Sequence, residues 1–152
     1  MARIIVQSAA FDIAAEIARM ADEAGTDCGA IVTFTGLCRS EKGALTALEL
    51  EHYPGMAEEE IGRIAKIAED RWPLDAATII HRYGKITPGE GIVLVLVASA
   101  HRAAAFEAAE FMMDYLKTHA PFWKKEHRTD GQEGSWVEAH NRDDVALGRW
   151  QD

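Results

Sequence analysis

Residues 117–126 read Lys-Thr-His-Ala-Pro-Phe-Trp-Lys-Lys-Glu, and this stretch forces a break in secondary structure. Pro121 lacks an amide donor and disfavours helix in the residue before it, so a helix must end there and an extended strand can begin at Phe122. Lys117 then lies in the last helical turn, whereas Lys124 lies on the strand. If the strand folds back beside the helix end, the two ammonium groups face one pocket, and we expect that pocket to take an anionic ligand.

Each lysine also has a plainer explanation. Lys117 would answer the partial negative charge of the unpaired carbonyls at a helix C-terminus. Lys124 alternates with Phe122 and Glu126 along one face of the strand, where it would be a solvated charge beside Glu126. Taken singly, neither lysine identifies a site.

The composition is that of one soluble globular domain. The chain has 152 residues, of which 48% are hydrophobic and 27% charged, so we expect a single domain over 1–152 with a polar C-terminal tail over 139–152. The net charge of −9 disfavours general binding to nucleic acid or to an anionic membrane. No segment resembles a signal peptide or is long enough to cross a bilayer, and we therefore expect a cytoplasmic protein.

Cysteine and histidine usage indicates neither metal nor redox chemistry. Cys28 and Cys38 are spaced unlike a redox pair or a zinc site, so both are expected to be free thiols. Arg39 could stabilise a Cys38 thiolate, but an inert cysteine at a strand end is the favoured interpretation. The six histidines form no metal-binding helix motif, and the sequence predicts no metal and no other cofactor.

The order of elements predicts an α+β fold with mixed or antiparallel sheets and three main helices. The helices are predicted over 12–25, from just after Gly55 to Trp72, and over 102–118. The strands are predicted over 3–7, 29–37, 45–53, 76–83, 92–99, 122–128 and 135–139. In the polar tail Trp150 stands out, because an exposed indole would leave apolar area in water, and we expect it to pack on the domain or on a partner chain.

A second candidate anion site is Ser99-Ala-His-Arg102, where an apolar strand ends and the long helix begins. Unpaired amides at a helix start attract phosphate, and Arg102 would add a charged contact while His101 would add a further donor. The alternative is that Ser99 caps the helix and the other two side chains are only solvated neighbours.

Several blocks in one order carry a resemblance to a known family. They are Val32-Thr-Phe-Thr-Gly36 with Arg39, Leu50-Glu-His-Tyr-Pro-Gly-Met56, Ile80-His-Arg82, Ser99-Ala-His-Arg102, Met113-Asp-Tyr-Leu-Lys-Thr and Ala120-Pro-Phe-Trp-Lys-Lys-Glu126. Over most of its length the chain resembles the large, catalytic subunit of molybdopterin synthase.

That resemblance implies a fold, an activity and partners. The family fold is an α/β hammerhead with an added antiparallel sheet. Its activity is sulfur transfer to cyclic pyranopterin monophosphate, which makes the dithiolene of molybdopterin. The sulfur donor is the C-terminal thiocarboxylate of a small ubiquitin-like subunit, and the assembly is a homodimer of large subunits within a heterotetramer.

The resemblance also assigns roles to residues of this chain. The essential lysine of the family falls on Lys117 and its second lysine on Lys124, while Arg39, His101 and Arg102 match anion-binding positions. Both reactants are anions, so fixed positive charge is needed to bring them together. The hypothesis is therefore that Lys117 is the principal catalytic group, Lys124 stabilises the thiocarboxylate, and the other three hold the phosphate or pterin.

Two other classes of function stay open at this stage. In one, the chain is a non-catalytic docking module for a ubiquitin-like tail, and the lysines serve only the partner's carboxylate. In the other, Phe122, Trp123, Lys124 and Lys125 form a stacking surface for single-stranded nucleic acid, which the acidic total charge disfavours.

Overall fold

The structure is a computed structural model that describes residues 1–131, 133–137 and 141–151. Its strands are β1 (Arg3–Gln7), β2 (Ala30–Leu37), β3 (Leu45–His52), β4 (Leu74–Arg82), β5 (Gly84–Ile86), β6 (Gly91–Ser99), β7 (Phe122–Arg128) and β8 (Glu133–Val137). Its helices are α1 (Ile13–Ala24), α2 (Met56–Arg71), α3 (Arg102–His119) and α4 (Asn141–Gly148). The predicted α+β class with mixed and antiparallel sheets is confirmed.

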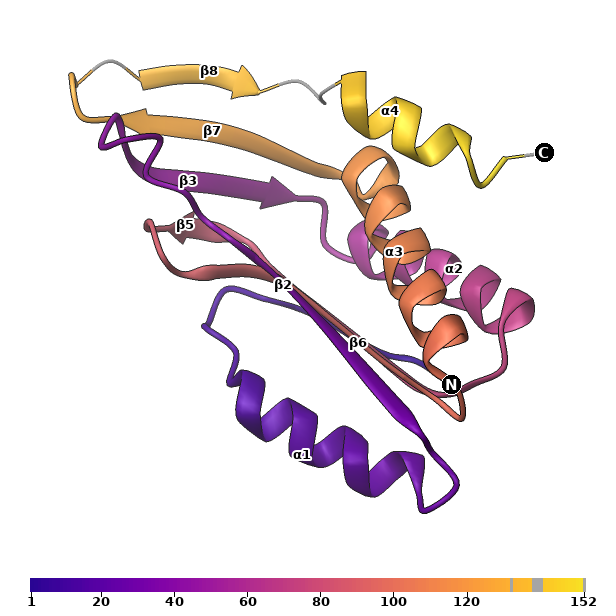
Figure 1. Ribbon diagram of the computed structural model, residues 1–152. Coiled ribbons are helices and arrows are strands. Elements are labelled where there is room, and N and C mark those ends of the chain that lie inside the picture. Colours follow the sequence, from indigo (N-terminus) through magenta and orange to yellow (C-terminus); the bar gives the residue numbers. More distant parts are fainter. Residues whose placement is uncertain (132, 138–140, 152) are drawn as a thin grey trace.

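The first sheet has the order β1-β4-β6-β2 and carries helices on both faces (Figure 1). Strand β1 runs parallel to β4, while the β4–β6 and β6–β2 pairs are antiparallel. Helix α1 covers one face, and α2 and α3 cover the other. Because β2 is the last strand in the order, its outer edge makes no strand pair within the described residues.

The central strand β6 explains how the core is divided. Its residues Val93, Val95 and Val97 belong to the core under α2 and α3, whereas Leu94 and Leu96 belong to the core under α1. Successive side chains of a strand point to opposite faces, so a strand covered on both faces has to be apolar throughout. This is why the predicted strand over 92–99 carries no polar alternation.

The second sheet is antiparallel, with the order β5-β3-β7-β8, and it continues from the end of α3 (Figure 1). The backbone at Ala120 is extended, with φ −66° and ψ 126°, and β7 starts at Phe122, so the predicted break before Pro121 is confirmed. Strand β7 pairs with β3 in a register that sets Lys124 opposite Leu50. The chain after α3 therefore folds back beside the helix end.

Most predicted elements are confirmed within one or two residues, and the differences are local. Strand β5 and helix α4 were not predicted, because β5 is only three residues long and α4 lacks a strong apolar stripe. The predicted last strand over 135–139 is observed as β8 at Glu133–Val137. Residues 138–140 and 152, which belong to that strand and to the predicted tail, lie outside the described residues.

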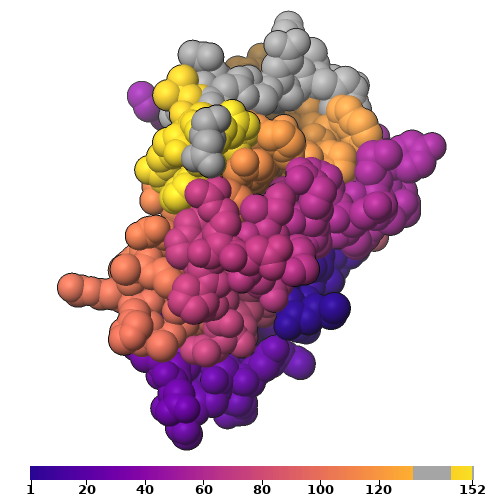
Figure 2. Space-filling view, turned by 90° about the vertical axis from the view of Figure 1, so that its right-hand side faces the viewer, coloured from indigo at the N-terminus to yellow at the C-terminus, as the bar shows by residue number. Residues whose placement is uncertain are grey.

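The predicted packing of Trp150 on the domain is confirmed. Its ring meets those of Trp72 and Phe111 edge-on, with centroids 5.7 and 5.6 Å away. Figure 2 shows α2 in the middle of one face of the molecule with the C-terminal segment beside it and α3. The tail is thus a packed part of the domain as far as it is described.

None of the helices in the described residues has the length and apolar character needed to span a membrane.

Candidate functional site

A narrow hollow lies where the last turn of α3, the end of β2 and the start of β7 meet. Its volume is about 100 Å³. Its walls are mostly apolar, and its polar side chains come from Lys117, Lys124 and His81. The full lining is Phe34, Gly36, Leu37, His81, Ile92, Val93, Met113, Leu116, Lys117, Ala120, Phe122 and Lys124.

The two lysines reach this hollow from different elements, as predicted. Lys117 comes from the last turn of α3, and Lys124 comes from the face of β7 that also carries Phe122. The helix stop at Pro121 and the pairing of β7 with β3 turn the second lysine back toward the first. The convergence of Lys117 and Lys124 is confirmed, while their chemical roles stay predictions.

His81 is a residue of the hollow that the sequence analysis had not assigned to the site. It lies near the end of β4 and is 8% exposed. Its ring stacks on Phe122, with centroids 3.8 Å apart and planes 13° apart. The available signal was a histidine and an arginine at the end of an otherwise apolar strand, which is also where the strand leaves the core.

The protonation of His81 follows from its surroundings. Its Nδ1 is 2.9 Å from the carbonyl oxygen of Arg82, which can only accept, so Nδ1 carries the proton. Burial lowers the pKa of His81 to about 4, the hydrogen bond to Arg82 opposes this, and the nearby charges of Lys124 and Lys117 lower the pKa further. His81 is therefore a neutral imidazole near pH 7.

The remaining nitrogen of that imidazole opens to the hollow. Nε2 of His81 makes no hydrogen bond within the described residues. In that part of the chain, every fully buried side-chain nitrogen or oxygen has a hydrogen-bond partner. Nε2 is therefore not fully buried, and the space that the ring borders is the hollow. A neutral acceptor beside two ammonium groups can receive a hydrogen bond without cancelling their charge, which a carboxylate in its place would do.

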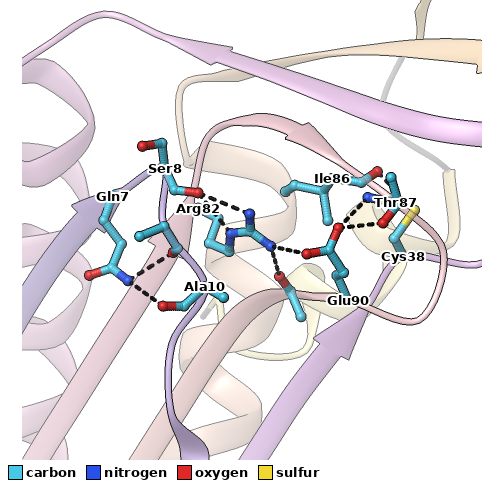
Figure 3. A network of polar contacts seen from close by, with 10 residues as sticks. Gln7, Ser8, Ala10, Cys38, Arg82, Ile86, Thr87 and Glu90 are labelled. Atoms are coloured by element: carbon cyan, nitrogen blue, oxygen red, sulfur yellow. Dashed lines mark hydrogen bonds and ion pairs between the residues drawn. The ribbon is translucent and has the colours of Figure 1, made fainter.

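A buried arginine on β4, Arg82, ties the N-terminal segment to the turn between β5 and β6 (Figure 3). Arg82 donates from Nε and Nη2 to the carbonyl oxygen of Ser8, at 3.1 and 2.9 Å, and from Nη1 to Gly91 O at 3.2 Å. Nη1 also lies 3.5 Å from a carboxylate oxygen of Glu90. The β5–β6 turn is thereby fixed to the N-terminal segment.

The same turn holds the start of the loop after β2. The amide of Cys38 donates to Glu90 O at 2.9 Å, and the amide of Gly89 donates to Cys38 O at 2.8 Å. Hydrogen bonds from Thr87 lower the pKa of the Glu90 carboxyl, so Glu90 stays ionised beside Arg82. The backbone next to Arg39 is thus fixed, although its side chain is 71% exposed and pairs with Glu41 at 3.0 Å.

The structure does not bring the other predicted anion-binding residues to the hollow. Arg39 follows the pocket-lining end of β2 but is not part of the lining. His101 and Arg102 lie at the start of α3, and 15 residues of helix at 1.5 Å each set Arg102 roughly 22 Å from Lys117 along the axis. Within one chain, then, only the two lysines of the five predicted residues share a cavity. Both His101 and Arg102 are exposed.

A wider groove adjoins the hollow along the exposed edge of β2 and the side of α3. Its volume is about 520 Å³. Phe34, Met113 and Lys117 line both spaces, so Lys117 stands at their boundary. The rest of the groove is formed by Val32, Thr33, Phe106, Ala109, Glu110 and Asp114. Phe106 is 61% exposed, which is unusual for a large apolar side chain without a covering partner.

Neither cysteine belongs to either space. Cys38 is buried and its Sγ lies 3.6 Å from the carbonyl oxygen of Ile86. Burial raises the pKa of its thiol, with Glu90 and Glu41 adding to that effect against a hydrogen bond from the backbone of Leu48. The expected inert character of Cys38 therefore has a physical basis, and Arg39 is paired with Glu41 instead of with a thiolate. No three His, Cys, Asp or Glu side chains of the described residues gather as a metal site would require.

Comparisons with known proteins give one consistent result. A family model described as MoaE protein matches residues 6–119. A molybdopterin synthase catalytic subunit from Mesorhizobium japonicum is 66% identical over 146 residues, which cover 96% of this chain and 91% of that protein. The molybdopterin biosynthesis MoaE protein from Burkholderia ambifaria superposes with a TM-score of 0.83 and 46% identity, covering 99% of this chain and 98% of its own.

The same fold occurs in a more distant structure. It is described as a protein–protein complex of subunits 1 and 2 of molybdopterin-converting factor from Helicobacter pylori. The matched chain has a TM-score of 0.71 and 22% identity, with 93% of this chain and 91% of that chain covered.

Proposed function

This chain belongs to the MoaE protein family, and on that premise we propose that it transfers sulfur to cyclic pyranopterin monophosphate from the C-terminal thiocarboxylate of a small ubiquitin-like subunit. Its relatives are named as catalytic subunits of molybdopterin synthase, which makes it a subunit of an enzyme of molybdenum cofactor biosynthesis. Lys117 is the principal catalytic group, and Lys124 stabilises the incoming thiocarboxylate.

The observation that carries the proposal is the presence of two lysines in one narrow, mostly apolar hollow. Two anionic reactants repel each other, and positive charge fixed in a partly dry site offsets that repulsion better than charge in water. The neutral imidazole of His81 adds an acceptor there without adding negative charge. The arrangement therefore suits an anionic sulfur donor.

The sizes of the two spaces support a division of labour between them. A volume of about 100 Å³ is below the roughly 300–1,000 Å³ of usual small-molecule sites, which suits the end of an extended chain better than a fused ring system. The adjoining groove, at about 520 Å³, lies within the usual range of small-molecule sites. We assign the thiocarboxylate tail to the hollow and the pterin to the groove, with Lys117 between them.

A homodimer would complete the site. His101 and Arg102 are too far from Lys117 to act on the same ligand within one chain. The exposed edge of β2 and the uncovered Phe106 offer an apolar face to a second copy, and that copy would bring its own helix start to the groove. Arg39 and the second copy's His101 and Arg102 would then hold the phosphate. A chain of this fold forms a two-subunit complex in Helicobacter pylori, which supports a further, small partner subunit for this chain.

The test is reconstitution from purified components. The chain is mixed with a thiocarboxylated ubiquitin-like carrier and cyclic pyranopterin monophosphate, and the dithiolene product is measured. Lys117→Ala should abolish product while binding of the carrier, measured by calorimetry, persists. Lys124→Ala should mainly weaken the use of the carrier. Near-normal turnover by Lys117→Ala would refute its assignment. If the unaltered chain binds the carrier but yields no product, the docking-module alternative is correct instead.

A further inference from the structure

The wider groove contains two carboxylates that should interfere with its own lysine. Asp114 and Glu110 line the groove together with Lys117. On a helix, residues three and seven positions apart lie on one face, so Asp114 is one turn and Glu110 two turns from Lys117. An aspartate three residues before a lysine is placed to form an ion pair with it. Such a pair would occupy the ammonium that the anionic reactants require.

The structure shows those carboxylates bound elsewhere. The indole Nε1 of Trp150 donates to Asp114 Oδ2 at 2.6 Å, and Arg149 Nη2 lies 3.4 Å from the same oxygen. Arg149 also forms a close ion pair with Glu110. Lys117, by contrast, makes no hydrogen bond or ion pair with any of the described residues. The side chain of Asp114 is only 16% exposed, whereas Lys117 is exposed, so water screens a pair between them only in part.

The C-terminal segment is held in a position from which it can bind the carboxylates of Glu110 and Asp114. Arg71 donates from Nη1 to the carbonyl oxygen of Trp150 at 3.2 Å, and its guanidinium lies over the rings of Trp72 and Trp150 at 5.1 and 5.8 Å. Leu147, in the last turn of α4, is buried. Figure 2 shows the segment lying against α2 and α3. The contacts of Trp150 with Asp114 are therefore set by tertiary packing from two helices.

We propose that Arg149 and Trp150 are positioning residues for Lys117, because they hold the carboxylates of Glu110 and Asp114 and so leave the Lys117 ammonium available to the anionic reactants. The inference deepens the proposed function and rests on it for the identity of those reactants. It concerns charge and not the packing of the tail, which makes it separable from a purely structural role.

The experiment uses a double variant that combines Arg149→Gln with Trp150→Phe. It keeps an aromatic ring at the end of the tail but removes the charge of Arg149 and the indole donor of Trp150. Released from the tail, Asp114 pairs with Lys117, and kcat/KM for sulfur transfer should fall about three- to fivefold. Adding Asp114→Asn removes the competing carboxylate and should restore kcat/KM to within about 1.5-fold of the unaltered chain.

A second readout needs no substrate. The rate at which an amine-reactive acylating reagent labels Lys117, followed by mass spectrometry, should fall in the double variant and recover when Asp114→Asn is added. Arg63→Gln, which breaks the exposed Arg63–Glu60 pair on α2, is the matched control and should change neither readout.

Two results would overturn the inference. One is normal labelling of Lys117 in the double variant. The other is a loss that Asp114→Asn does not repair, since a purely structural tail would give that pattern. The labelling result stands even if the reconstituted reaction yields no product, so a failure of the proposed function is distinguishable from a failure of this inference.

Discussion

The rings of His81 and Phe122 stack almost parallel with centroids 3.8 Å apart, and this contact joins the two sheets at the hollow. His81 belongs to β4 of the first sheet, and Phe122 begins β7 of the second. The ring of Phe122 also stacks on the ring of His52 in β3, with centroids 5.8 Å apart. The placement of Lys124, two residues after Phe122 on the same strand face, depends on this contact.

Protonation of His81 should make stability depend on pH. The pKa of His81 is lowered to about 4 in the folded chain, against 6.5 for an ordinary histidine, so between these values the unfolded chain binds more protons. Stability contributed by the neutral ring is complete above pH 6.5 and is lost as the pH falls toward 4. The loss should reach about 2 kcal/mol at about pH 5 in urea titrations.

Comparison with His81→Gln isolates the contribution of His81 to the pH dependence of stability. The amide side chain does not titrate, so the decline between neutral pH and about pH 5 should shrink by that amount while the other five histidines still contribute. Equal declines in both chains would contradict the assignment.

Truncation of Phe122 should cost stability and function together. Phe122→Ala removes a half-buried ring that packs on His81 and His52, and we expect a loss of about 2–3 kcal/mol in free energy of unfolding, below the about 3–5 kcal/mol of a fully buried phenylalanine. Trp123→Ala, on the opposite face of β7 and 49% exposed, should cost less than about 1 kcal/mol. Similar losses for both, measured by urea unfolding, would contradict the role of the stack.

The cysteines should be dispensable for sulfur transfer. Cys38 is 3% exposed, and burial raises the pKa of its thiol, so it stays protonated at neutral pH and is a poor nucleophile. Changing both Cys28 and Cys38 to Ser should leave turnover largely intact at a stability cost of about 1 kcal/mol. Iodoacetamide should label Cys28 before Cys38 in the folded chain. Loss of turnover in a folded double variant would point to a persulfide route.

Arg82 should control the order of the loop that carries Arg39. Arg82→Lys cannot reproduce the forked contacts to Ser8 and Gly91, and we expect a loss of about 2–3 kcal/mol in free energy of unfolding. Hydrogen exchange at the amides of Cys38 and Gly89 should speed up, and KM for the pterin should rise more than kcat falls. Arg128→Lys, an exposed control, should change none of these. An unchanged hydrogen-exchange rate at the Cys38 amide in Arg82→Lys would show that Arg82 does not control the order of that loop.

The sequence alone determined most of the secondary structure, and it predicts an anionic ligand. The apolar run of β6 requires burial on both faces, Asp12 caps α1 through the amide of Ala15, and Pro121 ends α3. These effects act between residues close together in the chain, which is why local pattern is sufficient. Lys117 and Lys124 also lie close together in the chain, on either side of Pro121, so the local sequence was sufficient to indicate an anionic ligand.

Only the tertiary structure decided which cations share a cavity. Lys117 and Lys124 meet because β7 pairs with β3, whereas Arg102 is held away by the length of α3, a distance that motif order does not reveal. His81 became a site residue only when β4 was packed against β7, and the hold of Trp150 on Asp114 joins positions 36 residues apart. Contacts between distant segments are set by the packing of whole elements. A single stretch of sequence therefore does not reveal which charged side chains these contacts will pair and which they will leave available.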